Sequence, residues 1–453
     1  QLNGPGLNLT AGNNITNSGT GTSFFNSLNA SAGNTINLNR NITSDQNLIL
    51  SGSNINVASS VFLTSNNSDV SLGGNISGSY LYLSAANGES RLTAGSSVNN
   101  LAYLYMLADN INLNSSSINT TYGVYLNQQS TGGTLNINSD ISTSLGWVNI
   151  RGNDNNIVFA NGSNISSASY IDINSTDGNI ALASLQTLTG DIRVTTQNGA
   201  ISDNNGAAVN IETAGAIYLN ATNGIGNNDP LEIISLGQNT SLSATNTGLG
   251  NIEISNTGTI LLDNITSTQP GNEFYIQSNG TVNVNSIELD KSSNLSVATF
   301  DITNGNVRGE PGNNKHLTAN SAVFYMNTTG VVGIRELNEP FITDVPNELE
   351  VVLSSGPNYI AYYQGIPPRL FTGDNDYKNR ALQAIDSLSS QQLIEVESLS
   401  EIDPAIFTDV RNYSHSDIAL MMPSDQRYDL SDEEEEDEEA KEKSNKLIHS
   451  QNL

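Results

Sequence analysis

The chain has 453 residues, no cysteine, 13% charged residues and a formal net charge of −29 at pH 7. The missing cysteine excludes disulfides and cysteine-based metal sites. An acidic balance without clustered lysine and arginine argues against nucleic acid or an anionic membrane surface as a partner. No apolar run approaches the ~18 residues of a membrane-spanning helix, so direct insertion into a bilayer is not expected.

Short stretches of alternating apolar and polar residues recur about every 22 residues from about residue 20 onward. This period of two is typical of a strand with one buried face. The apolar anchors fall into three columns: Leu48, Val70, Leu92, Ile111, Leu135, Ile157, Ile180 and Ile201; Val61, Leu81, Leu104, Val124, Val148, Ile171 and Ile192; and Ile55, Ile76, Val98, Ile118, Ile141 and Ile165. Three strands in each repeating turn predict an all-β solenoid, a parallel β-helix.

Polar, uncharged residues mark the corners and the extent of this solenoid. Segments such as 52–54 and 162–164, both Gly-Ser-Asn, precede third-column strands and suit tight corners. Equivalent side chains on stacked corners lie over one another, which favours Asn, Ser and Thr because stacked like charges repel. Of 67 asparagines, 59 lie before residue 331. The sequence therefore predicts a β-helix repeat rod over residues 1–330.

After residue 331 the composition changes. Residues 331–428 are predicted to form a mixed segment, rich in proline and partly α-helical, that caps the open end of the rod. Within it, apolar residues at mostly three-residue steps predict an amphipathic helix over 379–399, and Asp403-Pro404 predicts the start of another. Residues 429–453 are predicted to be a disordered acidic tail, with nine acids in the eleven residues from Asp429 to Glu439.

The outward positions on either side of the second-column anchors carry aromatic residues. Stacking the coils in register places these side chains in two adjacent ladders on one outer face: Tyr80, Tyr82, Tyr103, Tyr105, Tyr125, Trp147 and Tyr170, with Phe62 before them and Tyr218 after. An exposed aromatic stripe is typical of a contact surface for a sugar or a protein. The alternatives are that stacked tyrosines only stabilise the sheet, or that the segment after residue 331 covers them.

Catalytic patterns are scarce. The three histidines, His316, His415 and His449, lie outside the regular coils and never at metal-ligand spacing, so no metal or other cofactor is expected. The one candidate acid/base cluster places Asp172 beside Arg193 on neighbouring coils, with Asp191 flanking. Such a cluster is what a β-helical polysaccharide lyase or hydrolase needs. The alternative is a surface ion pair across the ladder.

Several turn-plus-strand segments resemble the repeats of filamentous haemagglutinin-like proteins, the large bacterial exoproteins of two-partner secretion. These segments are residues 190–194, 222–226, 246–254 and 255–258. The resemblance covers roughly residues 20–330. It implies a right-handed parallel β-helix, export through an outer-membrane transporter, and a role in adhesion or contact between cells.

The expected function is therefore that of a secreted or surface-displayed bacterial adhesin and virulence factor. In this reading the chain is a non-enzymatic rod that attaches to a glycan or protein on a host or bacterial surface. One alternative is the β-helix polysaccharide lyase or hydrolase. A second is a spacer rod of a larger contact-dependent exoprotein, although residues 331–453 are acidic and contain no plausible nucleophile or metal site for a toxic module.

Overall fold

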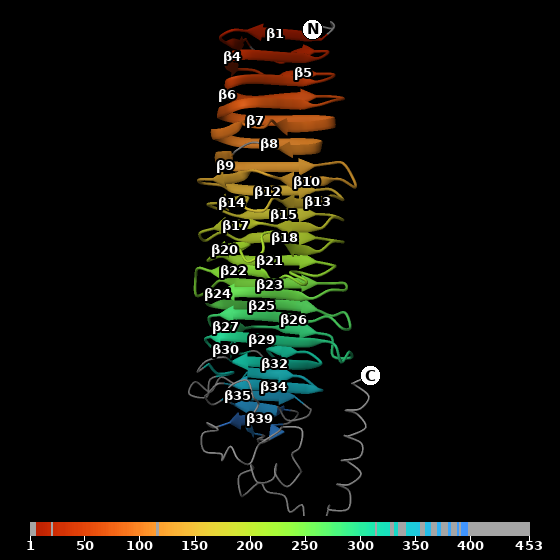
Figure 1. The fold of residues 1–453 in the computed structure, drawn as a ribbon, viewed down its shortest axis with the longest axis vertical. Coiled ribbons are helices and arrows are strands. Elements are labelled where there is room, and N and C mark those ends of the chain that lie inside the picture. Colours follow the sequence, from red (N-terminus) through yellow and green to blue (C-terminus); the bar gives the residue numbers. More distant parts are fainter. Residues whose placement is uncertain are drawn as a thin grey trace, which may run out of the picture.

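The computed structural model describes residues 6–396, except residues 20, 115–116, 313–314, 327–329, 334–340, 354–357, 364–368, 373–378, 382–386 and 389–390. These described residues form strands and no helix. The strands stack as a β-solenoid of about 15 turns, ~22 residues apart, which gives the tall rod of Figure 1. Within the same residues no helix is long and apolar enough to cross a membrane.

The first strands are long, because several of them run round the corners of the rod. β7 has 23 residues and follows one complete coil. The strands of this part are β1 (Leu7–Ala11), β2 (Ile15–Asn17), β3 (Ser23–Phe25), β4 (Leu28–Leu38), β5 (Ile42–Ser44), β6 (Leu48–Ser65), β7 (Val70–Leu92), β8 (Ser97–Leu113) and β9 (Ser117–Gln128).

Further along the rod, turns separate the strands of each coil. These strands are β10 (Thr134–Ile137), β11 (Asp140–Thr143), β12 (Trp147–Gly152), β13 (Asn156–Phe159), β14 (Asn164–Ser167), β15 (Ile171–Ser175), β16 (Ile180–Leu182), β17 (Ser184–Thr187), β18 (Ile192–Thr196), β19 (Ile201–Asp203), β20 (Ile211–Thr213), β21 (Ala216–Ala221), β22 (Leu231–Ser235), β23 (Ser241–Asn246), β24 (Ile252–Thr257) and β25 (Ile260–Ser267). Apart from β19, each pairs in parallel with strands of the coils before and after it. β19 pairs with β16 and is joined to the next coil by a single bridge between Ile201 and Ile225.

The last described strands are β26 (Phe274–Asn279), β27 (Val282–Val284), β28 (Ile287–Leu289), β29 (Val297–Asn304), β30 (Val307–Gly309), β31 (Leu317–Thr318), β32 (Ser321–Met326), β33 (Phe341–Asp344), β34 (Glu348–Leu353), β35 (Asn358–Tyr363), β36 (Arg369–Thr372), β37 (Asn379–Ala381), β38 (Ser387–Leu388) and β39 (Gln391–Val396). Parallel pairing continues through β36, which pairs with β34. The change in composition at residue 331 is therefore not the end of the parallel stack.

The register confirms two of the predicted columns pair by pair. In the second column Val61 pairs with Leu81, and the pairing continues through every predicted anchor to Ile192. The third column is likewise continuous from Ile55 to Ile165.

The first column is wrong at one position. Ser90, not Leu92, pairs with Ile111, while Leu92 pairs with Leu113. Both Ser90 and Leu92 are buried, because residues two apart on a strand face the same way. Because the buried anchor at this position is a serine, the apolar pattern placed the anchor two residues too late, at Leu92.

The interior of the rod is filled by the inward side chains of all three sheets. Isoleucine, leucine and valine dominate the described coils up to residue 260, and phenylalanine becomes prominent after it. Phe300 stacks on Phe324 with ring centroids 4.6 Å apart, and Phe274 meets Phe300 edge-on at 5.9 Å. Burial of this apolar surface is the main stabilising contribution to the fold.

Buried hydroxyl groups form a second kind of interior ladder where strands end at a corner. Thr187 Oγ1 donates to the carbonyl oxygen of Gly190 at 2.6 Å, and Thr213 Oγ1 donates to the same oxygen at 2.9 Å. The same column also contains Thr120, Thr143, Ser167 and Ser235. The hydroxyls of Thr143, Ser167, Thr187 and Thr213 satisfy corner carbonyls that would otherwise be buried without a partner, at a cost of about 1–3 kcal/mol each.

Two adjacent threonines allow this contribution to be measured. Thr196 is 1% exposed, and its Oγ1 donates to Gly178 at 2.7 Å and accepts from the Gly199 amide at 3.0 Å. We expect Thr196→Val to lower the free energy of unfolding by about 2 kcal/mol, because two backbone groups lose their partner. Thr195 faces outward, and Thr195→Val should change it by less than about 0.5 kcal/mol. Equal effects in urea unfolding would contradict this role for the hydroxyl ladder.

The helix predicted over residues 379–399 is wrong wherever the structure describes that range. β37 forms an antiparallel pair with β36, and β39 pairs antiparallel with β38 and with β35. The last parallel coil presents unpaired backbone groups, and strands satisfy them whereas a helix cannot. The helix predicted from Asp403 and the acidic tail 429–453 lie outside the described residues.

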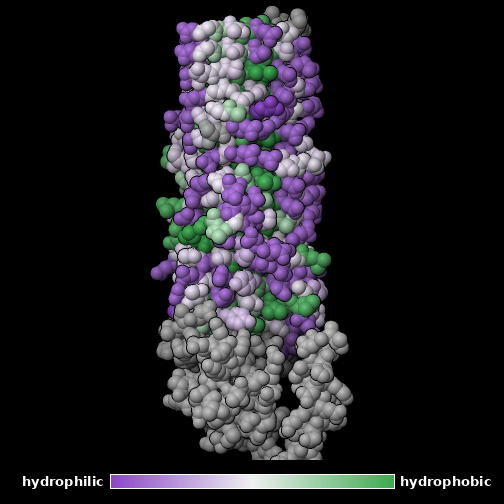
Figure 2. Space-filling model, viewed as in Figure 1, coloured by the Kyte–Doolittle hydropathy of each residue, from purple (hydrophilic) through white to green (hydrophobic). Residues whose placement is uncertain are grey.

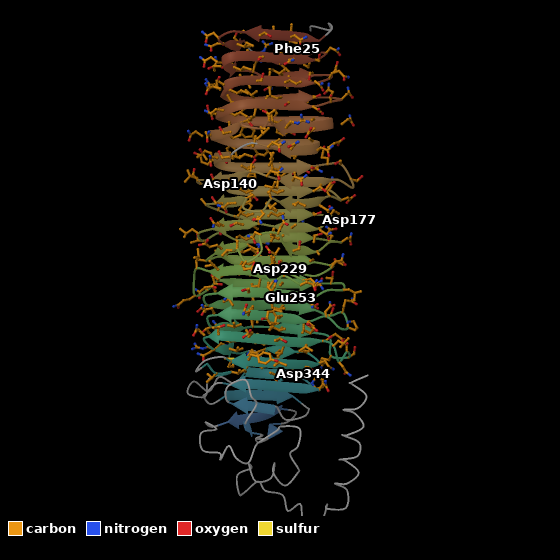
Figure 3. All side chains as sticks on the ribbon, viewed as in Figure 1. Phe25, Asp140, Asp177, Asp229, Glu253 and Asp344 are labelled. Carbon is orange, nitrogen blue, oxygen red and sulfur yellow. The ribbon has the colours of Figure 1, made fainter. Side chains whose placement is uncertain are left out.

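The side chains of Asp344 and His316 connect strand β33 to the coils before it. Both lie near the C-terminal end of the described stack, where Figure 3 labels Asp344. The Asp344 carboxylate accepts from Lys291 Nζ at 2.9 Å and Lys315 Nζ at 2.7 Å. His316 is 3% exposed; its Nδ1 accepts from the Ile342 amide at 2.9 Å, and its Nε2 lies 3.0 Å from the Glu310 carbonyl oxygen. The imidazole is therefore neutral, with its proton on Nε2.

Burial lowers the pKa of His316 below its ordinary 6.5. The native chain thus binds fewer protons than the unfolded chain, so the contribution of His316 to stability is present above pH 6.5 and is lost as the pH falls below it. The lysines lower the pKa of Asp344 in spite of its burial, so its contribution persists until the pH falls below 3.8. Glu232 has the opposite effect on the pH dependence of stability. Burial and the nearby Asp203 raise its pKa to about 7, so its contribution to stability is present at low pH and is lost as the pH rises.

We therefore expect the effect of His316 to appear when the melting temperatures of the wild type and of a His316 variant are compared at several pH values. Between about pH 7 and pH 5, the wild-type melting temperature should fall relative to that of His316→Asn, whose side chain does not titrate. Glu232→Gln is the matched control and should change the pH dependence in the opposite sense. Parallel curves for the wild type and His316→Asn would contradict the assignment of a neutral, hydrogen-bonded imidazole.

Candidate ligand-binding face

The two predicted outward ladders are present in the register of the second-column sheet. One ladder follows Phe62, Tyr82, Tyr105 and Tyr125, and continues through Asn149, Asp172, Arg193 and Tyr218. The other follows Ser60, Tyr80, Tyr103, Gly123 and Trp147. Tyr170 lies next, because the amide of Val148 donates to its carbonyl. Strands β7, β8, β9 and β12, together with the turn before β15, thus carry all seven predicted residues.

The aromatic rings of these ladders touch one another in an unbroken chain from Phe62 to Tyr170. Phe62 and Tyr82 have ring centroids 5.1 Å apart, and Tyr80 stacks on Tyr105 at 5.0 Å. Tyr105 meets Trp147 edge-on at 6.2 Å, and Trp147 in turn stacks on Tyr170 at 6.2 Å with an interplanar angle of 10°. We call this set, from Phe62 to Tyr170, the aromatic stripe.

The stripe is partly open to solvent. Phe62 is 42% exposed and Tyr170 38% exposed, while the rings between them are half-buried, largely against one another. This crowding raises the pKa of Tyr105 well above its usual range, first through desolvation and then through a hydrogen bond with Tyr80. The described strands after residue 331 stack at the far end of the rod (Figure 1). They therefore do not cover the stripe.

The surroundings of the stripe are polar. The face of the rod in Figure 2 is mainly hydrophilic, with apolar residues in separate patches. Isolated exposed leucines such as Leu249 (71%) and Leu295 (69%) occur away from the stripe. Single exposed apolar residues are ordinary on protein surfaces, whereas a continuous run of rings is not.

Sequence reasoning missed one member of the stripe, Tyr122. Its ring is 44% exposed and stacks on Tyr103 with centroids 5.3 Å apart. The neighbouring ladder position is Gly123, where the indole of Trp147 occupies the space that a side chain would need: a Cβ there would lie 2.9 Å from Trp147 Cε2. The sequence contained a signal for Tyr122, because this tyrosine directly precedes Gly123, a ladder position that has no side chain.

The acid/base cluster predicted around Asp172, Asp191 and Arg193 is divided between two separate ion pairs. Asp172 and Arg193 are register neighbours, as predicted. However, the Asp172 carboxylate accepts from Arg151 at 2.9 Å, and Arg151 lies on the preceding coil rather than on the coil of Arg193. Arg193 instead pairs with Asp191 at 3.4 Å and lies over the ring of Tyr218, 4.2 Å from its centroid. Each carboxylate thus has its own guanidinium partner, which corresponds to the alternative of a surface ion pair.

An uncharged hollow of about 280 Å³ lies at the corner that leads into Tyr122. Its lining consists of amides and hydroxyls only: Asn100, Asn119, Thr120, Thr121, Ser142, Thr143, Ser144 and Ser166. Because Thr121 precedes Tyr122 in the chain, the hollow adjoins the aromatic stripe. Among the described residues no group of histidines and carboxylates could hold a metal ion.

Comparison of this chain with protein-family models, with curated proteins and with solved structures finds no match. The chemistry of the face therefore has to be derived from its own side chains: flat rings with phenol groups, flanked by amides and hydroxyls. Such rings bind the apolar faces of sugars or of other side chains, and the polar groups bind hydroxyls or amides.

The packing of Trp147 over Gly123 gives a direct spectroscopic test of the stripe. We expect Gly123→Ala to displace the indole, because the added methyl group would overlap the ring. Trp147 is the only tryptophan, so its fluorescence should shift to the red and become more accessible to iodide. Gly12→Ala, at an exposed position with open space around it and no left-handed backbone, is the control for a glycine replacement elsewhere. An unchanged Trp147 spectrum in Gly123→Ala would contradict the described ring packing.

Proposed function

We propose that this chain is a secreted or surface-displayed bacterial adhesin, a non-enzymatic rod that attaches to a glycan or protein on a host or bacterial surface through the aromatic stripe. The observation that carries the proposal is the unbroken run of partly exposed rings on an otherwise polar rod. Monomeric proteins seldom leave such a run in water without a partner for it.

The ionisable groups of the coils favour binding over catalysis. A glycosidase or lyase needs a carboxylate free to donate or accept a proton. Asp172 and Asp191 each lie within an ion pair. Both pairs flank the end of the stripe near Tyr170, where they can orient a bound ligand by hydrogen bonds.

The resemblance to filamentous haemagglutinin-like repeats supports the remaining features of this proposal. These features are a right-handed turn of the β-helix, passage through an outer-membrane transporter, and display at the cell surface. A chain without cysteine suits that route, because it cannot become cross-linked before it crosses the membrane.

The proposal is tested by attachment of the purified chain to cultured epithelial cells and to bacterial cells. We expect the combined replacement Tyr103→Ser, Tyr122→Ser and Trp147→Ser to reduce attachment about tenfold or more, since buried aromatic anchors dominate interface energies. Leu249→Ser with Leu295→Ser is the matched control, because it removes exposed apolar groups outside the stripe. Each lost ring pair should cost only about 0.2–1 kcal/mol in stability. Wild-type chain that attaches to neither cell type would overturn the adhesin proposal.

A further inference from the structure

We infer that the ligand of the aromatic stripe is a single extended, uncharged polysaccharide chain that lies along the axis of the rod. This inference rests on the proposed function and specifies its ligand. It follows from the dimensions of the stripe, from its repeat and from the charges around it.

The stripe is long and narrow. From Phe62 to Tyr170 it crosses five strand-to-strand steps, or roughly 24 Å at ~4.8 Å per step. Its two ladders are two residues apart on each strand, or roughly 7 Å. The resulting contact area, on the order of 200–300 Å², is well below the ~800 Å² per partner of a stable protein interface. A globular protein or a second copy of this chain would therefore be a poor fit, whereas one extended polymer matches the shape.

The rings recur at a fixed interval along the axis. Tyr80 and Tyr103 occupy successive positions of one ladder, and Tyr82 and Tyr105 those of the other, each one strand spacing apart. The rise per sugar in an extended 1,4-linked pyranose chain is close to this spacing. Successive sugars can therefore meet successive rings in equivalent positions, which a ligand without a repeat cannot do.

The charges around the stripe favour an uncharged polymer. Both ladders lack a charged residue from Ser60 to Asn149, and the next outward residue on each strand is also uncharged up to Asn127, whose Nδ2 donates to Tyr125 Oη at 3.1 Å. The whole chain has a net charge of −29. An anionic polysaccharide would be repelled by this charge without a cationic group among the rings to hold it.

The hollow beside Tyr122 supplies groups that suit sugar hydroxyls. Its amides and hydroxyls donate and accept hydrogen bonds without charge. Thr120, 4% exposed, lines the hollow, and its Oγ1 has no hydrogen-bond partner among the described residues. A chain that lies along the exposed sides of Tyr103 and Tyr122 would place the edge of a sugar ring next to this hollow.

The test is calorimetric titration of the full chain with cello-, chito-, xylo- and manno-oligosaccharides, from disaccharide to heptasaccharide. We expect one of the series to bind, with an affinity that rises with each added sugar and levels off near the length of the stripe. Polygalacturonate and hyaluronan oligosaccharides of equal length should bind at least about tenfold more weakly. Equal affinity for disaccharide and hexasaccharide, or tighter binding of the anionic series, would overturn the inference.

Variants distinguish the stripe from other surfaces. Tyr103→Ser with Trp147→Ser should lower the affinity for the longest bound oligosaccharide about tenfold or more, and Leu249→Ser with Leu295→Ser should leave it unchanged. Binding that survives the stripe variant would place the site elsewhere and overturn the inference. If no uncharged series binds while attachment to cells still depends on the stripe, the partner is a protein: this inference then fails and the adhesin proposal stands.

Discussion

In-register stacking of parallel strands is the constraint on which the rest of this structure depends. Each side chain lies about 4.8 Å from the equivalent side chain of the coil before and of the coil after. Each position therefore favours a residue type that packs well against the same type on the neighbouring coils, as well as one that suits its degree of burial. Apolar side chains meet this condition in the core, hydroxyls meet it at the corners, and aromatic rings meet it on the outer face.

The same constraint explains the scarcity of charge and the form that charge takes. Several ionisable residues of the ladders occur beside residues of opposite sign, as with Arg151 and Asp172, or beside a ring, as with Arg193 and Tyr218. Asn and Ser replace them elsewhere, because an amide can both donate to one neighbour and accept from the other. Asn119, for example, donates to Asn99 and accepts from Ser142.

Much of the fold and of the candidate face could be predicted because register converts a linear pattern into positions in space. Once Val124 and Val148 are aligned, Tyr125 and Trp147 must lie on the outer face of the sheet. Prediction failed where that logic does not operate. Ser90 is a polar residue in an apolar column, and Tyr122 lies where β9 runs round a corner and its register with β8 shifts. Strands β37 and β39 pair antiparallel at the end of the stack, where edge strands override helical periodicity.

The direction of the hydrogen bonds between coils also determines how the rod responds to force. These bonds run along the axis, and the strands of each coil pair with those of the neighbouring coils. Tension applied along the axis loads every interface between coils, and an end coil opens first because it has a neighbour on one side only. Each coil of ~22 residues that opens adds roughly 70 Å of extended chain. A rod of this kind can absorb mechanical work in many small steps while the coils that bear the aromatic stripe remain folded.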